Sequence, residues 1–517
     1  MVLSKKPIFY GVLATSAIAL ILILSLILGI KGFFAGLFLI GISAILFQYP
    51  RTSLYLFLIY LCFGGTITYL VPGVYQVSEG FVSFGTMYPI LQIIKDIFYF
   101  PALIAIIFFS NTIREIIPRN KPLLWGIGIF SLVCLLTFLF VNFPQESITN
   151  EGSPILVGIL GFKVWLSYIP LILCGFYLTK KKQQLIFITR LQIVLIITCC
   201  LLTLFQYYAL TSGLCIGSVG LPAPAFHRAS LQARCLVGGS LLYYPDWNLI
   251  RLPGTFVAPW QWGWFLISSI FFSVGATVIN RDKTWHYISS ATSVLVIITT
   301  AVSGQRVAIF FVPLFCVLLV AVTEINKNKL YLKLGIIAFV AAISPFITIF
   351  NQAISSLIGR WEYSPPDDFT LNSLGIVINN HRGIFGNGLG TTSSTARKLG
   401  DTTLIEVFPA QLIYEMGYLG LITFFILATI IVILGWKSYR KIKDPYLNKF
   451  ALCLWIFILF ISYNPYYYPL NVDPVNVYYW LSIGILLKLP SLENLNKNHD
   501  SNLNTESLMP KNLHSKQ

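Results

Sequence analysis

Arginine residues recur in segments that lie between apolar stretches and that should face away from the cytoplasm. They are Arg228, Arg234, Arg251, Arg306, Arg360, Arg382 and Arg397. An arginine at the outer boundary of a membrane can contact lipid phosphates, pair with a carboxylate, or bind an anionic substrate. Several of these arginines border just two loops and one hairpin tip, so we interpret them as a converging cationic site. A pyrophosphate suits such a site because a guanidinium presents paired planar donors and keeps its charge.

The sequences around these arginines restrict where the side chains can lie. Arg251 opens RLPGTF, directly before a Pro-Gly turn and an apolar segment, so it should lie at the outer membrane boundary. Arg306 ends SGQR, a tight turn between two apolar segments. A third motif, NNHRGIFGNGLG, contains Gly386, Gly388 and Gly390. These glycines permit either close approach to a ligand or a re-entrant turn packed on a helix, and the Lys-Ser/Thr pair of a phosphate loop does not follow them.

The histidines and acidic residues form no pattern typical of metal ligands. The chain has five histidines. Two of them, His227 and His381, fall in the outer segments but lack the paired spacing of a zinc site. Asp367 and Asp368 are interpreted as a solvated acidic turn rather than a cation site. We therefore expect neither a bound metal nor a cofactor.

The elements that must position these residues are membrane spans. The chain has 517 residues, of which 56% are hydrophobic and only 10% charged, and its mean hydropathy is +0.77. Soluble domains are about one-quarter charged, so we predict an all-α polytopic membrane protein. The net charge of +16 would suit nucleic-acid binding in a soluble chain. Here lysine and arginine gather in short loops, as the positive-inside rule requires, and nucleic acid is not an expected partner.

About fourteen apolar segments are long enough to span a bilayer. The basic loops that alternate with them place both termini in the cytoplasm and leave two large loops outside. The predicted parts are N-terminal spans over 1–210, an outer loop over 211–256, spans with the outer SGQR hairpin over 257–354, a second large outer loop over 355–409, C-terminal spans over 410–490, and a disordered cytoplasmic tail over 491–517.

Two of the nine cysteines differ from the others in their surroundings. Seven lie inside apolar segments, where cysteine acts as a small buried hydrophobic residue. Cys215 and Cys235 both fall in the first large polar loop. Because that loop is expected outside the cytoplasm, we predict a disulfide between them.

Five motifs occur in the order found in a known family. RLPGTF, SGQR, GRW, NNHRGIFGNGLG and YEMGYLGL follow one another between Arg251 and Phe425. In this order and at these topological positions they resemble the O-antigen ligase/polymerase superfamily, which includes Wzy-type polymerases and O-antigen ligases. The first half of the chain resembles that family only in hydropathy and number of spans.

The resemblance implies polysaccharide or lipopolysaccharide biosynthesis at the outer face of the inner (plasma) membrane. In that family, arginines at the positions of Arg251 and Arg306 hold a polyprenyl pyrophosphate that carries a glycan. Arg360, which opens the large loop, is the expected third contact, and Arg382 is a further one. The implied reaction is a metal-independent glycosyl transfer. Its expected partners are the lipid-linked glycan, the membrane lipid and a chain-length regulator.

The same resemblance suggests which residues handle the acceptor. Ligases carry a His-Asn pair shortly before the Glu-x-Gly that opens the closing helix. Glu415 and Gly417 match that Glu-x-Gly, and Glu415 is a further candidate for substrate binding. Glu406 stands at the histidine position, which favours a polymerase over a ligase. The acceptor hydroxyl needs a proton acceptor, and Glu406 and His381 are the candidates. A carboxylate that merely caps the following helix is the alternative role of Glu406.

A transporter or flippase for a small anion or a lipid-linked sugar is the alternative function. Lys95, Asp96 and Lys163 fall within apolar segments. Ionisable groups inside a membrane often mark ion or proton paths. The two halves of the sequence contain no evident inverted repeat or matching pair of broken segments, which weakens the transporter interpretation.

Overall fold

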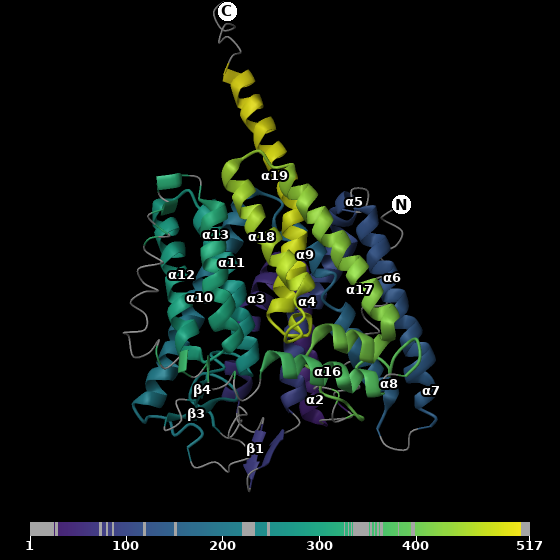
Figure 1. Ribbon diagram of the computed structural model, residues 1–517. Coiled ribbons are helices and arrows are strands. Elements are labelled where there is room, and N and C mark those ends of the chain that lie inside the picture. The colour runs from purple at the N-terminus through teal and green to yellow at the C-terminus, as the bar shows by residue number, and fades with distance from the viewer. Residues whose placement is uncertain are drawn as a thin grey trace, which may run out of the picture.

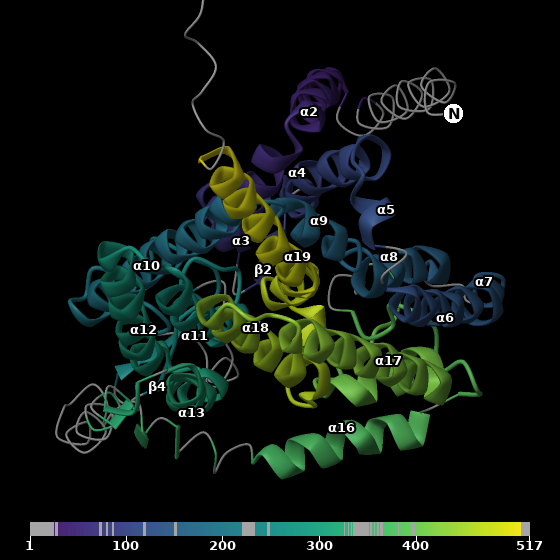
Figure 2. The same ribbon diagram turned by 90° about the horizontal axis from the view of Figure 1, so that it is seen from above.

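The computed structural model is a bundle of long helices (Figures 1 and 2). It describes residues 25, 29–71, 75–78, 81–84, 87–116, 120–148, 152–219, 233–245, 249–324, 326–328, 330–331, 333, 335, 351, 354–355, 357–358, 361, 365–380, 382–393, 396 and 399–507. Within these residues, ten helices are long and apolar enough to cross a membrane. The chain is therefore a mostly helical, multi-pass membrane protein.

The ten spans include single helices and runs of adjoining helices. They are α3 (Pro50–Leu70), α6 (Lys121–Thr137) with its continuation to Gln145, α8 (Pro154–Leu166) with α9 (Leu171–Leu178), α10 (Lys182–Thr211), α11 (Pro259–Ile279), α12 (Lys283–Ser303), α13 (Arg306–Thr323), α17 (Phe408–Arg440), α18 (Pro445–Tyr463) and the first part of α19 (Val475–Ser507). Each corresponds to one of the segments predicted from hydropathy.

The remaining predicted segments are only partly described. In α2 (Ile30–Gln48), the part Gly32–Gln48 is a shorter apolar helix, and the predicted fourth span forms α4 (Met87–Phe109). The segments predicted over 8–30 and 334–350 lie mostly outside the described residues. The total of about fourteen spans therefore stays a prediction.

Helices α11 and α19 form the centre of the bundle. In each, 83% of the apolar window is buried, compared with 28% to 50% in the other eight spans. Helix α19 packs on α9, where Gly484 faces the Ile172 carbonyl and Gly175 faces the Leu481 carbonyl. A Cβ at either glycine would overlap the facing oxygen, so these small residues allow the two backbones to approach closely.

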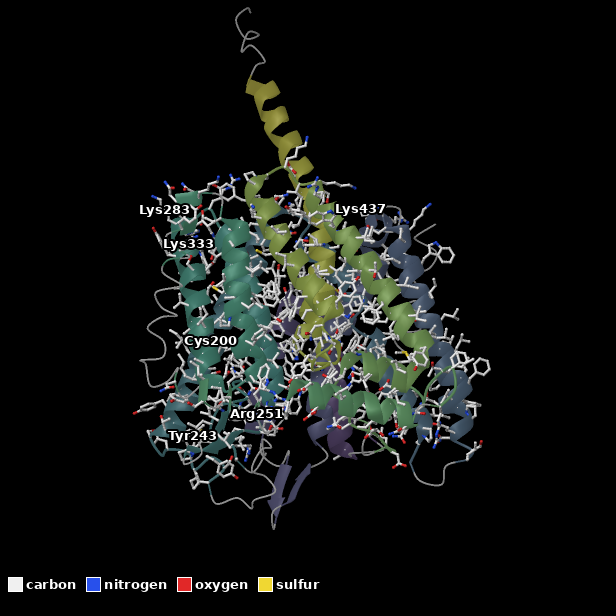
Figure 3. All side chains as sticks on the ribbon, in the orientation of Figure 1. Cys200, Tyr243, Arg251, Lys283, Lys333 and Lys437 are labelled. Atoms are coloured by element: carbon white, nitrogen blue, oxygen red, sulfur yellow. A yellow bond between two sulfur atoms is a disulfide. The ribbon has the colours of Figure 1, made fainter. Side chains whose placement is uncertain are left out.

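The two ends of the bundle differ in charge. Lys283, Lys333 and Lys437 lie at one end, whereas Arg251 and Tyr243 lie at the other (Figure 3). The lysine-rich end is the one that the positive-inside rule assigns to the cytoplasm. We refer to the opposite end, which holds Arg251, as the outer end.

The span of α8 and α9 and the span that contains α6 are each interrupted. Between α8 and α9, Pro170 has no N–H to donate, and the Leu171 N–H donates to the Tyr168 carbonyl at 2.9 Å rather than to that of Ser167. The Ser167 carbonyl accepts a hydrogen bond from the Tyr99 hydroxyl at 2.9 Å. Helix α6 changes into a π-helical turn (Phe138–Asn142) before α7 (Phe143–Gln145). This turn places Asn142, which is fully buried, against the large outer loop.

The outer segments contain regular elements that the sequence did not predict. Strands β1 (Tyr75–Ser78) and β2 (Phe81–Phe84) form one antiparallel hairpin, and β3 (Leu242–Tyr244) and β4 (Leu249–Arg251) form another. Helix α16 (Pro366–Asn380) lies within the large second loop and packs on α17.

The C-terminal tail differs from the prediction of disorder after 490. Helix α19 continues to Ser507 and rises out of the bundle (Figure 1). Where it leaves the bundle, the Glu493 carboxylate accepts a hydrogen bond from the Lys443 backbone N–H at 2.9 Å. This contact joins the start of the extension to the loop between α17 and α18. The helix thus extends past the predicted boundary at 490, because a polar composition does not prevent a helix from continuing. The rest of the predicted tail, 508–517, lies outside the described residues.

Candidate functional site

The motifs RLPGTF and SGQR meet at the outer end of the bundle. Strand β4 ends at Arg251, and the next backbone N–H, that of Leu252, donates to the Ser303 carbonyl at 3.0 Å. Gly304, with φ of 63°, ends α12 in the left-handed conformation, and a Cβ there would overlap the Ile250 carbonyl oxygen. A glycine is therefore required for the hairpin turn to reach β4.

This contact brings the two predicted arginines into one hollow. The hollow is lined by Arg251, Trp260, Gly263, Trp264, Gln305, Arg306, Val307 and Tyr467. The Arg251 Nε atom is buried and has no hydrogen-bond partner among the described residues. Arg306 is only 8% exposed, and its Nη2 donates to the Tyr467 hydroxyl at 3.2 Å. The sequence prediction that these two arginines converge agrees with this arrangement.

The electrostatic environment of Arg251 favours an anionic ligand. Burial lowers the pKa of its guanidinium, and the neighbouring charge of Arg306 lowers it further, whereas Tyr467, Glu406 and Tyr468 raise it. A buried cation next to a second cation is costly because water no longer screens either charge. A negatively charged ligand in the hollow would offset this cost. Glu406 is near enough to Arg251 for its charge to act on that guanidinium.

Tyr467 connects the arginines to two other outer segments. Its backbone has a φ of 55°, a strained conformation for a residue with a Cβ, and its carbonyl accepts from Trp264 Nε1 at 3.2 Å. Phe369 of α16 stacks on its ring, with the centroids 5.3 Å apart. The neighbouring Tyr466 forms a β-bridge with Val407. Sequence reasoning missed Tyr467, because the only signal was its place in a loop rich in tyrosine, proline and asparagine.

Glu415 does not line the arginine hollow, and it binds the glycine-rich loop. Its carboxyl group is buried and accepts four hydrogen bonds. One oxygen accepts from Trp165 Nε1 at 2.7 Å and the Gly390 N–H at 2.9 Å. The other accepts from the N–H and the hydroxyl of Thr392 at 3.0 and 2.5 Å. These contacts use both carboxyl oxygens, so Glu415 holds the loop in place.

Helix α17 is interrupted where the same loop packs on it. Gly417 has φ of 67° and ψ of −170°, which are not helical. The carbonyls of Tyr414 and Glu415 accept instead from the backbone N–H groups of Asn387 and Gly388, at 2.7 and 3.1 Å. A Cβ at Gly417 would overlap the Ile384 carbonyl oxygen. Of the two interpretations of the glycine-rich motif, the structure therefore favours a turn packed on a helix.

Asn142 fixes the other side of the glycine-rich loop. Its amide oxygen accepts from the Leu389 N–H at 2.8 Å, and its amide nitrogen donates to the Leu389 carbonyl at 3.1 Å. The Asn142 amide thus makes to Leu389 the same two hydrogen bonds that one residue exchanges with its partner in an antiparallel sheet. The motifs that predicted a site in this loop therefore mark a rigid support, formed by α8, α17 and the π-helical turn.

The remaining predicted site residues have varied positions. Arg360 and His381 lie outside the described residues, and Arg382 is exposed. Cys215 and Cys235 form a disulfide. The other seven cysteines are buried. Within the described part of the chain, no group of three or more histidine, cysteine, aspartate and glutamate residues could hold a metal ion.

The charged residues inside the spans form ion pairs. Lys163 of α8 binds Asp96 of α4 at 2.5 Å. Lys95 of α4 binds Asp473, in the loop just before α19, and the Tyr168 hydroxyl lies 3.4 Å from the same carboxylate oxygen. These contacts join helices that are distant in sequence.

Comparison with known proteins adds no identification. Neither a family model nor a curated protein matches this chain. The function is therefore argued from the geometry of the arginine hollow and its surroundings.

Proposed function

We propose that this chain is a membrane glycosyltransferase. It polymerises, or ligates, polyprenyl-pyrophosphate-linked oligosaccharide repeat units on the outer face of the cytoplasmic membrane. The observation that carries the proposal is the pair of Arg251 and Arg306, which line one hollow at the end of the bundle opposite the lysine-rich loops. Two adjacent guanidinium groups suit a pyrophosphate, because each phosphate of the lipid-linked donor carries a negative charge.

In the proposed reaction, the arginine pair stabilises the negative charge that develops on the leaving group. The bond between the anomeric carbon of the donor glycan and a pyrophosphate oxygen breaks, and that carbon bonds to a hydroxyl oxygen of the acceptor glycan. Negative charge then grows on the leaving pyrophosphate. Arg251 and Arg306 are already held by β4 and the SGQR turn, so they stabilise this charge without reorganising in the transition state.

Glu406 is the proposed acceptor of the proton that leaves the hydroxyl. It precedes Val407, which pairs with Tyr466, and its charge acts on Arg251. A carboxylate at this position can both orient the acceptor and receive its proton. Glu406 also lies two residues before Phe408, the first residue of α17. Its alternative role is therefore that of an acid near the positive end of a helix dipole.

The aromatic residues of the hollow supply contacts for the uncharged parts of a substrate. Trp260 is 38% exposed, and Trp264 and Tyr467 line the same hollow. An aromatic ring can pack on the apolar face of a sugar or on a prenyl chain. The order of motifs and this arrangement together support membership of the O-antigen ligase/polymerase superfamily. Glu406 in place of a ligase histidine favours a polymerase.

A transporter or flippase remains the competing proposal, and the charged residues in the spans motivate it. Lys95, Asp96 and Lys163 are each engaged in an ion pair. Paired charges of this kind join α4, α8 and the loop before α19, which is a structural role that needs no transported ion. The cationic hollow suits a small anion or a pyrophosphate-linked sugar in a transporter as well, so conversion of the donor is the property that separates the two proposals.

Reconstitution with a lipid-linked oligosaccharide tests the proposal. The purified protein in liposomes should convert the donor to a ladder of products on a gel if it is a polymerase, or to a single shifted band if it is a ligase. A deletion strain should accumulate single lipid-linked repeat units on the outer face. Accumulation on the inner face, together with no conversion in liposomes, would instead support the flippase.

A further inference from the structure

Cationic side chains from separate helices also gather at the cytoplasmic end. Arg51 lies in the first turn of α3, and its guanidinium carbon lies 5.3 Å from the Tyr177 ring centroid. Lys180, just after α9, places its ammonium nitrogen 4.9 Å from the same centroid. Lys488 of α19 lies 4.4 Å from the centroid of the adjacent Phe176 ring. We call Arg51, Lys180 and Lys488 the Tyr177 cluster.

The positive charge of the Tyr177 cluster is only partly balanced. Glu115 of α5 (Thr112–Ile116) binds Lys488 at 2.8 Å. Three cations and this one carboxylate leave a net charge of +2, since 3 − 1 = 2. Burial lowers the pKa of Lys180, Glu115 raises it, and Lys488 and Arg51 lower it, so all four groups interact electrostatically.

The Arg51 side chain has an unused donor within this cluster. Its Nε atom is buried and has no hydrogen-bond partner among the described residues. Helix α3 begins at Pro50 without a side-chain cap, so the positive end of its dipole lies at the same place. A buried donor without a partner is unfavourable, and an anion that accepts from it would remove that penalty.

We propose that the Tyr177 cluster binds a phosphate group at the cytoplasmic boundary, presented by an anionic phospholipid headgroup or by a soluble phosphate. Arg51 supplies paired donors to two phosphate oxygens, and Lys180 supplies a second charge. The location favours the lipid, because Arg51 is the second residue of the span formed by α3, and Lys180 lies two residues beyond the span that ends at Leu178. Basic pockets between spans on this side of a membrane are suited to anionic headgroups.

Thermal unfolding of the detergent-solubilised full chain tests this site. The protein is titrated with a short-chain phosphatidylglycerol, with the matched phosphatidylcholine, and with inorganic phosphate. We expect phosphatidylglycerol to raise Tm in a saturable way and phosphatidylcholine to have no saturable effect. If inorganic phosphate alone gives the same rise at a similar concentration, the site takes soluble phosphates; if only the lipid acts, it is a lipid site. Both results support a phosphate-binding cluster.

Two variants and a matched control locate the effect. Arg51→Ala should weaken the apparent affinity for phosphatidylglycerol about 10-fold or more, because it removes charge-assisted donors. Lys180→Ala should weaken it less, and it serves if Arg51→Ala does not fold. Arg281→Ala is the control, because Arg281 lies outside the cluster and already binds Asp444 at 3.1 Å. The proposal fails if neither phosphatidylglycerol nor inorganic phosphate raises Tm. It also fails if Arg51→Ala and Lys180→Ala both show the same apparent affinity as the wild type.

Discussion

Replacing Arg306 by alanine tests the arginine hollow most directly, because the structure separates its effect on folding from its effect on turnover. The substitution removes the hydrogen bond to the Tyr467 hydroxyl, at 3.2 Å, and the contact of the guanidinium with the Tyr467 ring, at 5.8 Å from its centroid. Each contact is worth about 1 kcal/mol of stability. In the proposed reaction, the same substitution removes a positive charge that would stabilise the leaving pyrophosphate. Loss of one donor to a developing negative charge lowers kcat by about 100- to 1000-fold. Turnover should therefore fall far more than the change in unfolding would explain.

A double-variant cycle sharpens this expectation. Arg251 and Arg306 interact unfavourably, since the charge of Arg306 lowers the pKa of Arg251. Both should act on the same anion, so the Arg251→Ala/Arg306→Ala protein should lose less activity than the product of the two single losses. Arg251→Lys should also be strongly impaired, because an ammonium group cannot supply paired donors.

The assay is the initial rate of donor consumption in proteoliposomes, with Tm measured on the same samples. Arg440→Ala, at the cytoplasmic end of α17, is the control for loss of an arginine far from the hollow. The reasoning would be refuted if Arg251→Ala and Arg306→Ala both retained near-normal rates. It would also be refuted if the loss of rate simply followed the loss of folded protein.

The other predictions concern single carboxylates and the disulfide. Glu406→Gln should keep its size yet lower turnover by about 100-fold or more; a near-normal rate would leave Glu406 with only the helix-capping role. Glu415→Gln should lower the free energy of unfolding by about 1–3 kcal/mol, because the new amide nitrogen faces an N–H donor that the carboxylate oxygen had accepted from. Glu406→Gln is the comparison for Tm. An unchanged Tm of Glu415→Gln would contradict the role of Glu415 in holding the glycine-rich loop. Cys215 and Cys235 should resist thiol labelling until reductant is added, and reduction should destabilise the loop by about 3 kcal/mol; ready labelling without reductant would rule the disulfide out.

The sequence by itself determined the features that depend on local composition. Ten predicted spans correspond to helices, because burial in lipid requires about twenty successive apolar residues and leaves a continuous signal. The charge rule placed Lys283, Lys333 and Lys437 at one end and Arg251 at the other, as Figure 3 shows. The positions of Arg251 and Arg306 at the ends of short outer turns were also enough to suggest that they meet.

Only the tertiary structure decided which distant residues meet. Tyr467 contacts Arg306, which is 161 positions earlier in the chain, and Trp165 donates to Glu415 across 250 positions. No periodicity or composition signals such contacts, because they depend on how the helices pack. Glu415 illustrates the consequence. Its motif suggested a place near the substrate, but its four hydrogen bonds make it the support of the glycine-rich loop. A motif identifies a residue type at a position. Only the contacts of that residue show whether it takes part in the reaction or holds other residues in place.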